Sequence, residues 1–276
     1  MTLEPLPVRA LRAGETPDVD VPPVAGGTVV SLWLVRVAPD PGAYDLLDAG
    51  ERARWSAFVR EEDRARYLAA HGALRRLLGR FLDVRPEEVV LAREPCPLCG
   101  ATGREGGEGG GEGGFFFFSP EGRVFFGDDH IRALPALPAA VHFSLSHSGD
   151  LVLLGLGARP LGVDVEGRPA VSVADTVAGS LHPVEGAELA ALPPEERPAA
   201  FARCWARKEA YLKGTGAGLA GGVDRTYVGT GPAPASIQGW SLADVPVPSG
   251  FAAAVAVAAS APLPRPGTPS DGGSGA

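Results

Sequence analysis

The sequence lacks the features that mark membrane, secreted and nucleic-acid-binding proteins. It contains no apolar run of about 20 residues, so no membrane span is expected. It has only three cysteines, which favours a reducing compartment, and its start lacks the charged and then apolar layout of a secretion signal. Its net charge of −8 is the opposite of the basic excess typical of nucleic-acid binders. We therefore expect a cytoplasmic protein that binds neither membranes nor nucleic acids.

The chain also lacks a complete zinc site and a glycine-rich phosphate loop. Cys96 and Cys99 have the spacing of half a zinc site, but no second cysteine pair follows them, and the next histidine is His130. An ordinary turn with two thiols is the favoured interpretation, with metal binding as the alternative. No segment matches a P-loop, because no strand is expected directly before the glycines at 214–218.

The 276 residues, of which 45% are hydrophobic, are enough for one large domain or two small ones. Residues 1–27 and 261–276 are rich in proline and glycine and are predicted to be disordered. Between them, each half combines helices with strands, which predicts an α+β fold of two similar lobes. The N-terminal lobe is expected at 28–138, with a flexible Gly/Glu loop at 100–114, and the C-terminal lobe at 139–260.

Hydrophobic periodicity predicts the main elements of both halves. Helical spacing covers residues 51–81, with a break near 60–63, and returns at 184–192 and 195–214. Strands are expected at 29–37, 141–146, 151–156, 161–166, 227–229, 236–240 and 251–259.

Two carboxylates stand two residues apart in the strand-like segment Leu161-Gly-Val-Asp-Val-Glu166. Side chains alternate along a strand, so Asp164 and Glu166 point to the same side. Their charges repel, and burying them unpaired is costly, whereas a divalent cation removes both problems. Carboxylate oxygens suit Mg²⁺, which completes its shell with water and substrate phosphates. The alternative is a polar strand face turned to water, but the apolar neighbours indicate an inner strand.

A third carboxylate lies in the helical segment Trp205-Ala-Arg-Lys-Glu-Ala-Tyr-Leu-Lys213. Lys208 falls within the apolar arc of this helix, and Glu209 and Lys213 lie at its edge. A surface Glu209–Lys213 pair is the simplest alternative interpretation. The presence of two further carboxylates in the preceding strand favours a functional role instead.

A cluster of hydroxyls and an imidazole occurs in Ser144-Leu-Ser-His-Ser-Gly149, where a strand is expected to end in a turn. Such a junction can bind phosphate through hydroxyl, imidazole and backbone N–H groups. A nucleophilic serine would need a strand–turn–helix elbow, and here another strand follows. Phosphate binding is therefore favoured over a serine hydrolase and over a purely structural turn.

Taken in order, these three segments resemble the core motifs of the 4′-phosphopantetheinyl transferases. The resemblance covers about residues 29–259, and the run Asp63-Arg-Ala-Arg-Tyr-Leu-Ala-Ala-His71 is similar to the large type that activates polyketide and nonribosomal peptide synthases. It implies a monomer with two similar α+β lobes, related by a pseudo-two-fold axis, and an active site between them. It also implies that coenzyme A is the co-substrate and that an acyl or peptidyl carrier protein is the partner.

The resemblance implies roles for individual residues. Asp164, Glu166 and Glu209 would bind Mg²⁺, with Mn²⁺ as an alternative ion. Catalysis would depend on Asp164, on Lys213 and on Glu209, which would also act as the general base. The coenzyme A phosphates would be contacted by Ser146, His147, Lys208, Lys213, Arg54 and Arg66.

The implied reaction transfers the 4′-phosphopantetheine arm of coenzyme A to a carrier serine and releases adenosine 3′,5′-bisphosphate. Two alternatives stay open at this point: a Mg²⁺-dependent pyrophosphate or phosphodiester hydrolase, and an inactive carrier-binding protein. One departure from the family concerns residues 92–135, where a short basic element with proline is usual. Arg93 and Arg123 are the candidates to replace it.

Overall fold

The computed structural model describes residues 7–17, 30–93, 131–134, 142–216 and 222–259. The predictions for Cys96, Cys99, Arg123, the loop at 100–114 and the tail at 261–276 lie outside the described residues.

A four-stranded sheet contains strands from both halves of the chain. Its order is β1 (Val8–Leu11), β2 (Val30–Arg36), β6 (Leu151–Gly157) and β5 (His142–Ser148). β1 runs parallel to β2, and the other neighbours are antiparallel. For β1 the structure differs from the disorder expected over residues 1–27, because these four residues pair with β2 and bury Leu11.

A three-stranded antiparallel sheet has the order β7 (Leu161–Gly167), β9 (Phe251–Ala258) and β8 (Trp240–Asp244). The strands expected at 161–166 and 251–259 are confirmed. Two other expectations are wrong, because residues 227–229 form no strand and the third strand begins at Trp240. The backbone N–H groups of Val228 and Gly229 instead donate to Glu185, so a side chain satisfies them in place of a sheet partner.

The first half contributes a helical layer made of α1 (Ala43–Leu46), α2 (Ala49–Ala57) and α3 (Glu61–Leu82). The predicted break near 60–63 is confirmed, since α2 ends at Ala57 and α3 begins at Glu61. A 3-10 turn, η1 (Pro86–Glu88), follows α3. It leads to a two-stranded antiparallel sheet of β3 (Val90–Arg93) and β4 (Ile131–Leu134).

The second half contributes α4 (Val171–Ala178), α5 (Pro183–Ala191) and α6 (Arg197–Thr215). The helices expected at 184–192 and 195–214 are confirmed within two residues at each end. Proline at the start of α5 and of α6 suits the first turn, where its missing N–H has no helical partner. α6 ends at Thr215 and is capped by Gly216, whose φ of 71° lies in the left-handed region that glycine adopts readily.

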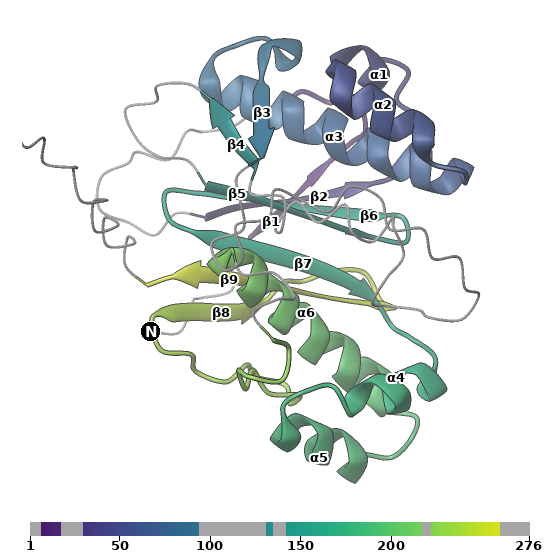
Figure 1. Cartoon of the computed structure of the whole chain (residues 1–276), viewed down its shortest axis with the longest axis vertical. Coiled ribbons are helices and arrows are strands. Elements are labelled where there is room, and N and C mark those ends of the chain that lie inside the picture. The colour runs from purple at the N-terminus through teal and green to yellow at the C-terminus, as the bar shows by residue number, and fades with distance from the viewer. Residues whose placement is uncertain (1–6, 18–29, 94–130, 135–141, 217–221, 260–276) are drawn as a thin grey trace, which may run out of the picture.

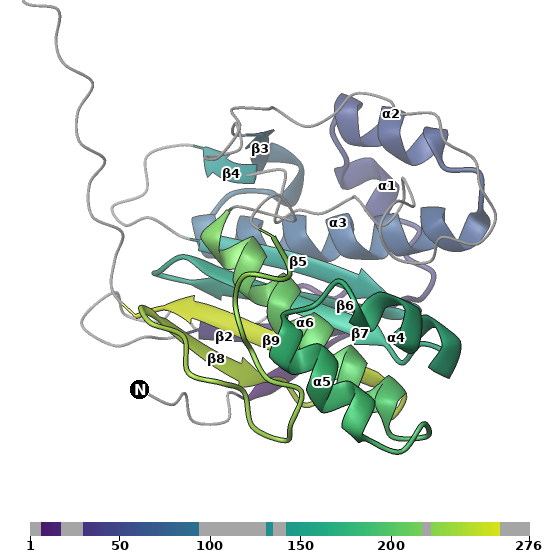
Figure 2. The same ribbon diagram turned by 60° about the horizontal axis from the view of Figure 1, so that its bottom comes forward.

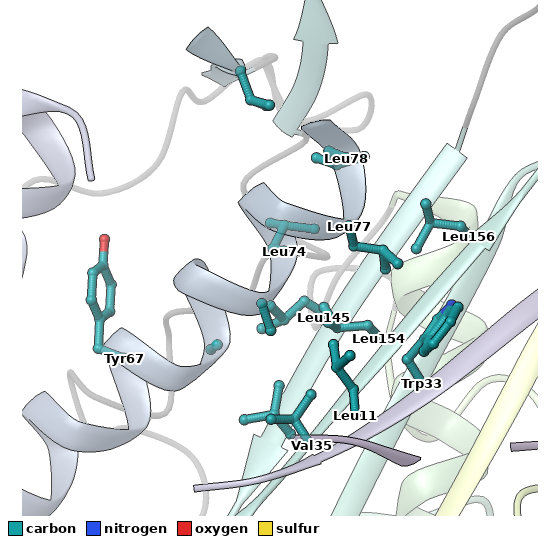
Figure 3. Close-up of a cluster of buried hydrophobic side chains, with 14 of the residues drawn as sticks. Leu11, Trp33, Val35, Tyr67, Leu74, Leu77, Leu78, Leu145, Leu154 and Leu156 are labelled. Carbon is teal, nitrogen blue, oxygen red and sulfur yellow. The ribbon is translucent and has the colours of Figure 1, made fainter. Parts of the chain in front are cut away.

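The elements stack in four layers, with α3 on the four-stranded sheet and α6 on the three-stranded sheet (Figures 1 and 2). The strands β6 and β9 are buried on both faces, which explains why they are almost continuously apolar. In β6, Leu153 faces the other sheet, while Leu154 faces α3. Figure 3 shows Leu74 and Leu77 of α3 directed toward this second face.

The mixed α+β composition expected from the sequence is confirmed. The four-stranded sheet takes β1 from the segment 1–27 that was expected to be disordered, β2 from the first predicted lobe, and β5 and β6 from the second. The lobe boundary near 138 and the pseudo-two-fold relation stay predictions.

Candidate active site between the sheets and helix α6

Helix α6 approaches β7 so closely that there is no space for a side chain at Gly162. A Cβ atom at this position would lie 2.1 Å from the carbonyl oxygen of Ala210 and 2.4 Å from the amide nitrogen of Gly214. Glycine therefore allows the helix backbone to rest on the strand backbone. Figure 2 shows α6 lying across the three-stranded sheet. This contact allows Lys213 of α6 to reach Asp164, which is two residues further along β7 than Gly162.

Asp164 is the centre of the site. Its Oδ1 accepts hydrogen bonds from Lys213 Nζ at 2.6 Å and from Ser146 Oγ at 2.7 Å. Its Oδ2 is buried and has no hydrogen-bond partner within the described part of the chain. A buried carboxylate oxygen without a donor is unfavourable and marks a place for a further positive group.

The electrostatics of the site are dominated by three carboxylates around one ammonium group. Burial, together with the charges of Asp164 and Glu209, raises the pKa of Glu166 well above its ordinary value. Burial lowers the pKa of Lys213, but the charges of Asp164 and Glu209 outweigh this and raise it, so the ammonium is charged. One ammonium does not balance three carboxylates when all of them are ionised, so an additional cation would favour their charged forms.

Carboxylate oxygens are suitable ligands for Mg²⁺, although the three carboxylates are not close enough together to form a complete metal site by themselves. Within the described residues, no three His, Cys, Asp or Glu side chains are grouped so that they could hold a metal ion. Mg²⁺ is usually bound by one or two carboxylates and completes its shell with water and phosphate oxygens. The unpartnered Oδ2 of Asp164 and the neighbouring Glu166 supply oxygen donors of this kind. The assignment of Asp164, Glu166 and Glu209 as one ligand set stays a prediction.

His147 and Arg66 meet at the end of β5. Arg66, on α3, donates from Nε to the carbonyl of Gly149 at 2.9 Å and from a terminal nitrogen to Asp63 at 2.7 Å. Burial and the charges of Arg66 and Lys213 lower the pKa of His147 to about 3. The imidazole is therefore neutral at physiological pH, and the charges around it form a positive region beside the carboxylates.

Arg54 lies on α2, next to the same region of α3. Its Nε is buried and has no hydrogen-bond partner within the described residues. Its charge also helps to lower the pKa of His71, after the larger effects of burial and of Arg75. The Nε–H group of Arg54 is therefore available to donate a hydrogen bond to a bound anion.

Lys208 points away from this cluster. It is five residues before Lys213, which on an α-helix is a rotation of about 140°. Its ammonium lies 2.6 Å from Oε2 of Glu185 and donates to the carbonyl of Thr226 at 2.7 Å. In this structure Lys208 therefore joins α6 to α5 through Glu185 and to the segment after α6 through Thr226, and its contact with coenzyme A stays a prediction.

Two serines of the predicted phosphate-binding cluster have a partner that the sequence analysis did not foresee. Ser144 and Ser148 accept hydrogen bonds from the backbone of β7, and the period-two spacing of serines in β5 was the signal that could have shown this. A buried network was missed altogether: Glu51 of α2 binds His71 at 2.6 Å and Arg75 at 2.8 Å, both on α3. His71 and Arg75 lie 20 and 24 residues from Glu51 in the sequence, and no local pattern connects them to it.

Comparison with known proteins identifies the family. A sequence model of the 4′-phosphopantetheinyl transferase superfamily matches residues 160–246. The 4′-phosphopantetheinyl transferase HetI of Nostoc sp. is 30% identical over 225 residues, which are 78% of this chain and 82% of HetI. The chain belongs to the 4′-phosphopantetheinyl transferase superfamily. The resemblance seen in the sequence motifs is thereby confirmed, and the protein is an enzyme of the transferase class.

Two further relatives of this transferase carry related names. The phosphopantetheinyl transferase of Thraustochytrium sp. is 29% identical over 226 residues, which are 74% of this chain and 65% of the relative. The 4′-phosphopantetheinyl transferase Sfp of Bacillus subtilis is 33% identical over 86 residues, which are 31% of this chain and 38% of Sfp. The segment matched by the superfamily model contains β7 and α6, and thus Asp164, Glu209 and Lys213. Among the described residues, no helix is long and apolar enough to cross a membrane.

Proposed function

We propose that this transferase moves the 4′-phosphopantetheine arm of coenzyme A to a serine of an acyl or peptidyl carrier protein, in the presence of Mg²⁺, and releases adenosine 3′,5′-bisphosphate. Membership of the superfamily and the names of HetI and Sfp support the transferred group. The observation that carries the proposal is the buried Asp164 beside Lys213, with one carboxylate oxygen that lacks a donor.

The donor set supports a role for Mg²⁺ in offsetting negative charge. When bound by Asp164, Glu166 and Glu209, the ion would neutralise charge on the diphosphate of coenzyme A. Mn²⁺ has similar preferences and is the alternative ion. Removal of divalent cations with a chelator is expected to stop transfer, and added Mg²⁺ is expected to restore it.

The chain's own residues account for the remaining steps. The carrier serine oxygen forms a bond to the phosphorus next to pantetheine, and the bond from that phosphorus to the oxygen of the adenosine 5′-phosphate breaks. Glu209, directly or through a water molecule, takes the proton of the serine hydroxyl. Lys213, whose ammonium is kept charged by its carboxylate neighbours, stabilises the negative charge on the leaving phosphate.

Coenzyme A is expected to bind along the positive region at the end of β5. Arg66 and Arg54 supply charge, and the neutral His147 can donate an N–H to the 3′-phosphate. Ser146 and Lys208 complete the set of residues proposed to contact coenzyme A.

The carrier protein is expected to be acidic and helical, as is common to partners of this family. Because this chain also has a net charge of −8, long-range attraction is weak, and contact is expected to depend on a local apolar surface between the two lobes. We expect the enzyme to act in the cytoplasm as a monomer.

The test is an intact-mass measurement of an unmodified carrier domain after incubation with the enzyme, coenzyme A and Mg²⁺. Transfer adds the mass of one phosphopantetheine group to the carrier. Asp164→Ala and Glu209→Ala are each expected to abolish this gain while thermal unfolding still shows a folded protein. Glu62→Ala is the matched control, because Glu62 is an exposed carboxylate on α3.

Two results would contradict the proposal. Cleavage of coenzyme A without modification of any carrier would indicate a hydrolase. Normal transfer by a folded Asp164→Ala variant would show that the site lies elsewhere. A panel of fatty-acid, polyketide and peptide carriers would define the physiological partner.

A further inference from the structure

The guanidinium of Arg66, on α3, is held at two points. Its Nε donates to the carbonyl oxygen of Gly149 at 2.9 Å, in the turn between β5 and β6. Its Nη1 donates to Oδ1 of Asp63 at 2.7 Å, in the first turn of α3. Because a guanidinium is planar and rigid, hydrogen bonds from two of its nitrogens fix both its position and the direction of its plane.

The third nitrogen of this guanidinium is available for a ligand. Among the described residues, the hydrogen bonds of the Arg66 side chain are those to Gly149 and Asp63, and both use the other two nitrogens. The side chain of Arg66 is 21% exposed, whereas that of Asp63 is only 9% exposed. A ligand from solution can therefore reach the arginine, while the aspartate that holds it is largely covered.

The carbonyl that accepts from Arg66 belongs to a tightly packed turn. Gly149 has a φ of 56°, and a Cβ atom at this position would lie 3.1 Å from Cζ of Phe251 on β9. The turn directly follows His147 and Ser148, which belong to the predicted phosphate-binding cluster. Arg66 thus attaches α3 to this cluster across 83 residues of sequence.

Two simpler roles for Asp63 would involve no ligand. Glu61, Glu62 and Asp63 make the first turn of α3 acidic, and such charges stabilise the N-terminus of a helix. An aspartate and an arginine three residues apart can also form a surface ion pair that contributes little. Asp63 differs from the other two acids because it is buried and they are exposed, so water screens its interaction with Arg66 less.

We propose that Asp63 is a positioning residue for coenzyme A: together with the carbonyl of Gly149, it holds the guanidinium of Arg66 so that the remaining N–H groups meet a phosphate of coenzyme A. This inference rests on the proposed function, in which Arg66 contacts coenzyme A. It gives Asp63, which has no role in that proposal, a specific one that it exerts through Arg66.

The carboxylate of Asp63 has two opposing effects on a bound phosphate. Its charge repels the phosphate, but its hydrogen bond orders a long side chain before the ligand arrives. Ordering one such side chain during binding lowers affinity by about 3-fold to 10-fold. We expect the ordering effect to be the larger one, because the charge of the carboxylate is already paired with that of Arg66.

Three substitutions of Asp63 separate these effects. Asp63→Ala, Asp63→Leu and Asp63→Asn all remove the charge, but only asparagine keeps an oxygen that can accept from Arg66. Leucine has nearly the shape of asparagine and lacks the acceptor. Glu62→Ala is the control, because it removes an exposed carboxylate from the same helical turn.

The test measures binding and turnover separately. The Kd for coenzyme A is measured by isothermal titration calorimetry with Mg²⁺ and without a carrier, and kcat and KM are obtained from carrier mass. We expect Asp63→Ala and Asp63→Leu to raise both the Kd and the KM for coenzyme A about 3-fold to 10-fold, with kcat nearly unchanged. Asp63→Asn is expected to bind at least as tightly as the wild type, and Glu62→Ala to bind like the wild type.

A double-variant cycle shows whether Asp63 acts through Arg66. In an Arg66→Ala background nothing is left to position, so adding Asp63→Ala is expected to leave the Kd unchanged or to lower it. An equal loss of affinity in both backgrounds would show that the two residues act independently. The comparison of Asp63→Asn with Asp63→Leu decides the question if Asp63→Ala fails to fold.

The inference is overturned if the asparagine and leucine variants bind coenzyme A equally well, or if the losses at the two positions add. It is also overturned if Arg66→Ala binds coenzyme A as tightly as the wild type. A wild type that binds coenzyme A but modifies no carrier would instead contradict the proposed function, and the Kd values would still decide the role of Asp63. A wild type that binds no coenzyme A would contradict both.

Discussion

The ammonium of Lys213 lies 2.6 Å from Oδ1 of Asp164, where α6 crosses β7. Both side chains are almost fully buried, at 2% and 3% exposure, so each charge depends on the other for its stabilisation. The contact connects two sequence motifs that are 49 residues apart. It also places a cation and an unpartnered carboxylate oxygen at the same point, which the proposed chemistry requires.

We first predict that the two charges are strongly coupled. Lys213→Met keeps the length of the side chain but leaves the Asp164 carboxylate buried without its cation. Breaking such a pair is expected to lower the free energy of unfolding by about 3–5 kcal/mol. Adding Asp164→Asn is expected to recover part of the loss. Urea denaturation of both single variants and the double variant measures this, and strictly additive losses would contradict it.

The second prediction concerns the binding of coenzyme A. Arg54→Ala and Arg66→Ala are each expected to raise the KM for coenzyme A about 10-fold or more, since a hydrogen bond to a charged group is worth about 1.5–3 kcal/mol. The kcat should change little, because neither residue contacts the reacting atoms. Arg80→Ala, an exposed residue on α3, removes the same charge and is the control. A fall in kcat at constant KM would contradict the assignment.

A third prediction tests the contact between α6 and β7. Gly162→Ala would place a Cβ 2.1 Å from the carbonyl oxygen of Ala210, and backbone atoms cannot move aside easily. Overpacking of this kind costs about 1–3 kcal/mol or more. We expect a lower Tm and loss of transfer, because Lys213 and Asp164 are pushed apart. Gly179→Ala, where no atom lies within 4 Å of the new Cβ, is expected to leave both quantities unchanged.

The fourth prediction is a pH dependence that comes from Glu51. Burial raises the pKa of this carboxyl, but the hydrogen bond and charge of His71, the hydrogen bond of Arg75 and the backbone of Asp48 outweigh it and lower the pKa from 4.5 to about 2. The folded state therefore binds the proton less tightly than the unfolded state. Its contribution is complete above about pH 4.5 and disappears as the pH falls to about 2, with a size of about 3 kcal/mol.

Glu51→Gln tests this dependence. The difference in unfolding free energy between wild type and variant is expected to be largest near pH 6 and to shrink steadily below pH 4.5. A difference that stays constant over this range would show that Glu51 contributes through packing alone. Circular dichroism during chemical denaturation, at several pH values, gives the required free energies.

Several elements could be predicted because their signals are local. The break between α2 and α3, the helix α6 and the strand β7 each follow from the spacing of apolar residues within one segment. The prediction of a strand at 227–229 was wrong because the conformation of this segment depends on a distant partner. Its backbone is satisfied by Glu185, which is 43 residues away from Val228, and no local pattern reports such a contact.

In the candidate site, too, some features have a local signal in the sequence and others depend on contacts between distant segments. By itself, the sequence determined which side chains share a face, since Asp164 and Glu166 are two apart on a strand and Glu209 and Lys213 are four apart on a helix. Only the tertiary structure decided that Lys213 meets Asp164 while Lys208 meets Glu185, and that serines of β5 hold the amides of β7. Periodicity within an element is set by local backbone geometry. The partners of each face are set by packing between segments that are distant in the chain.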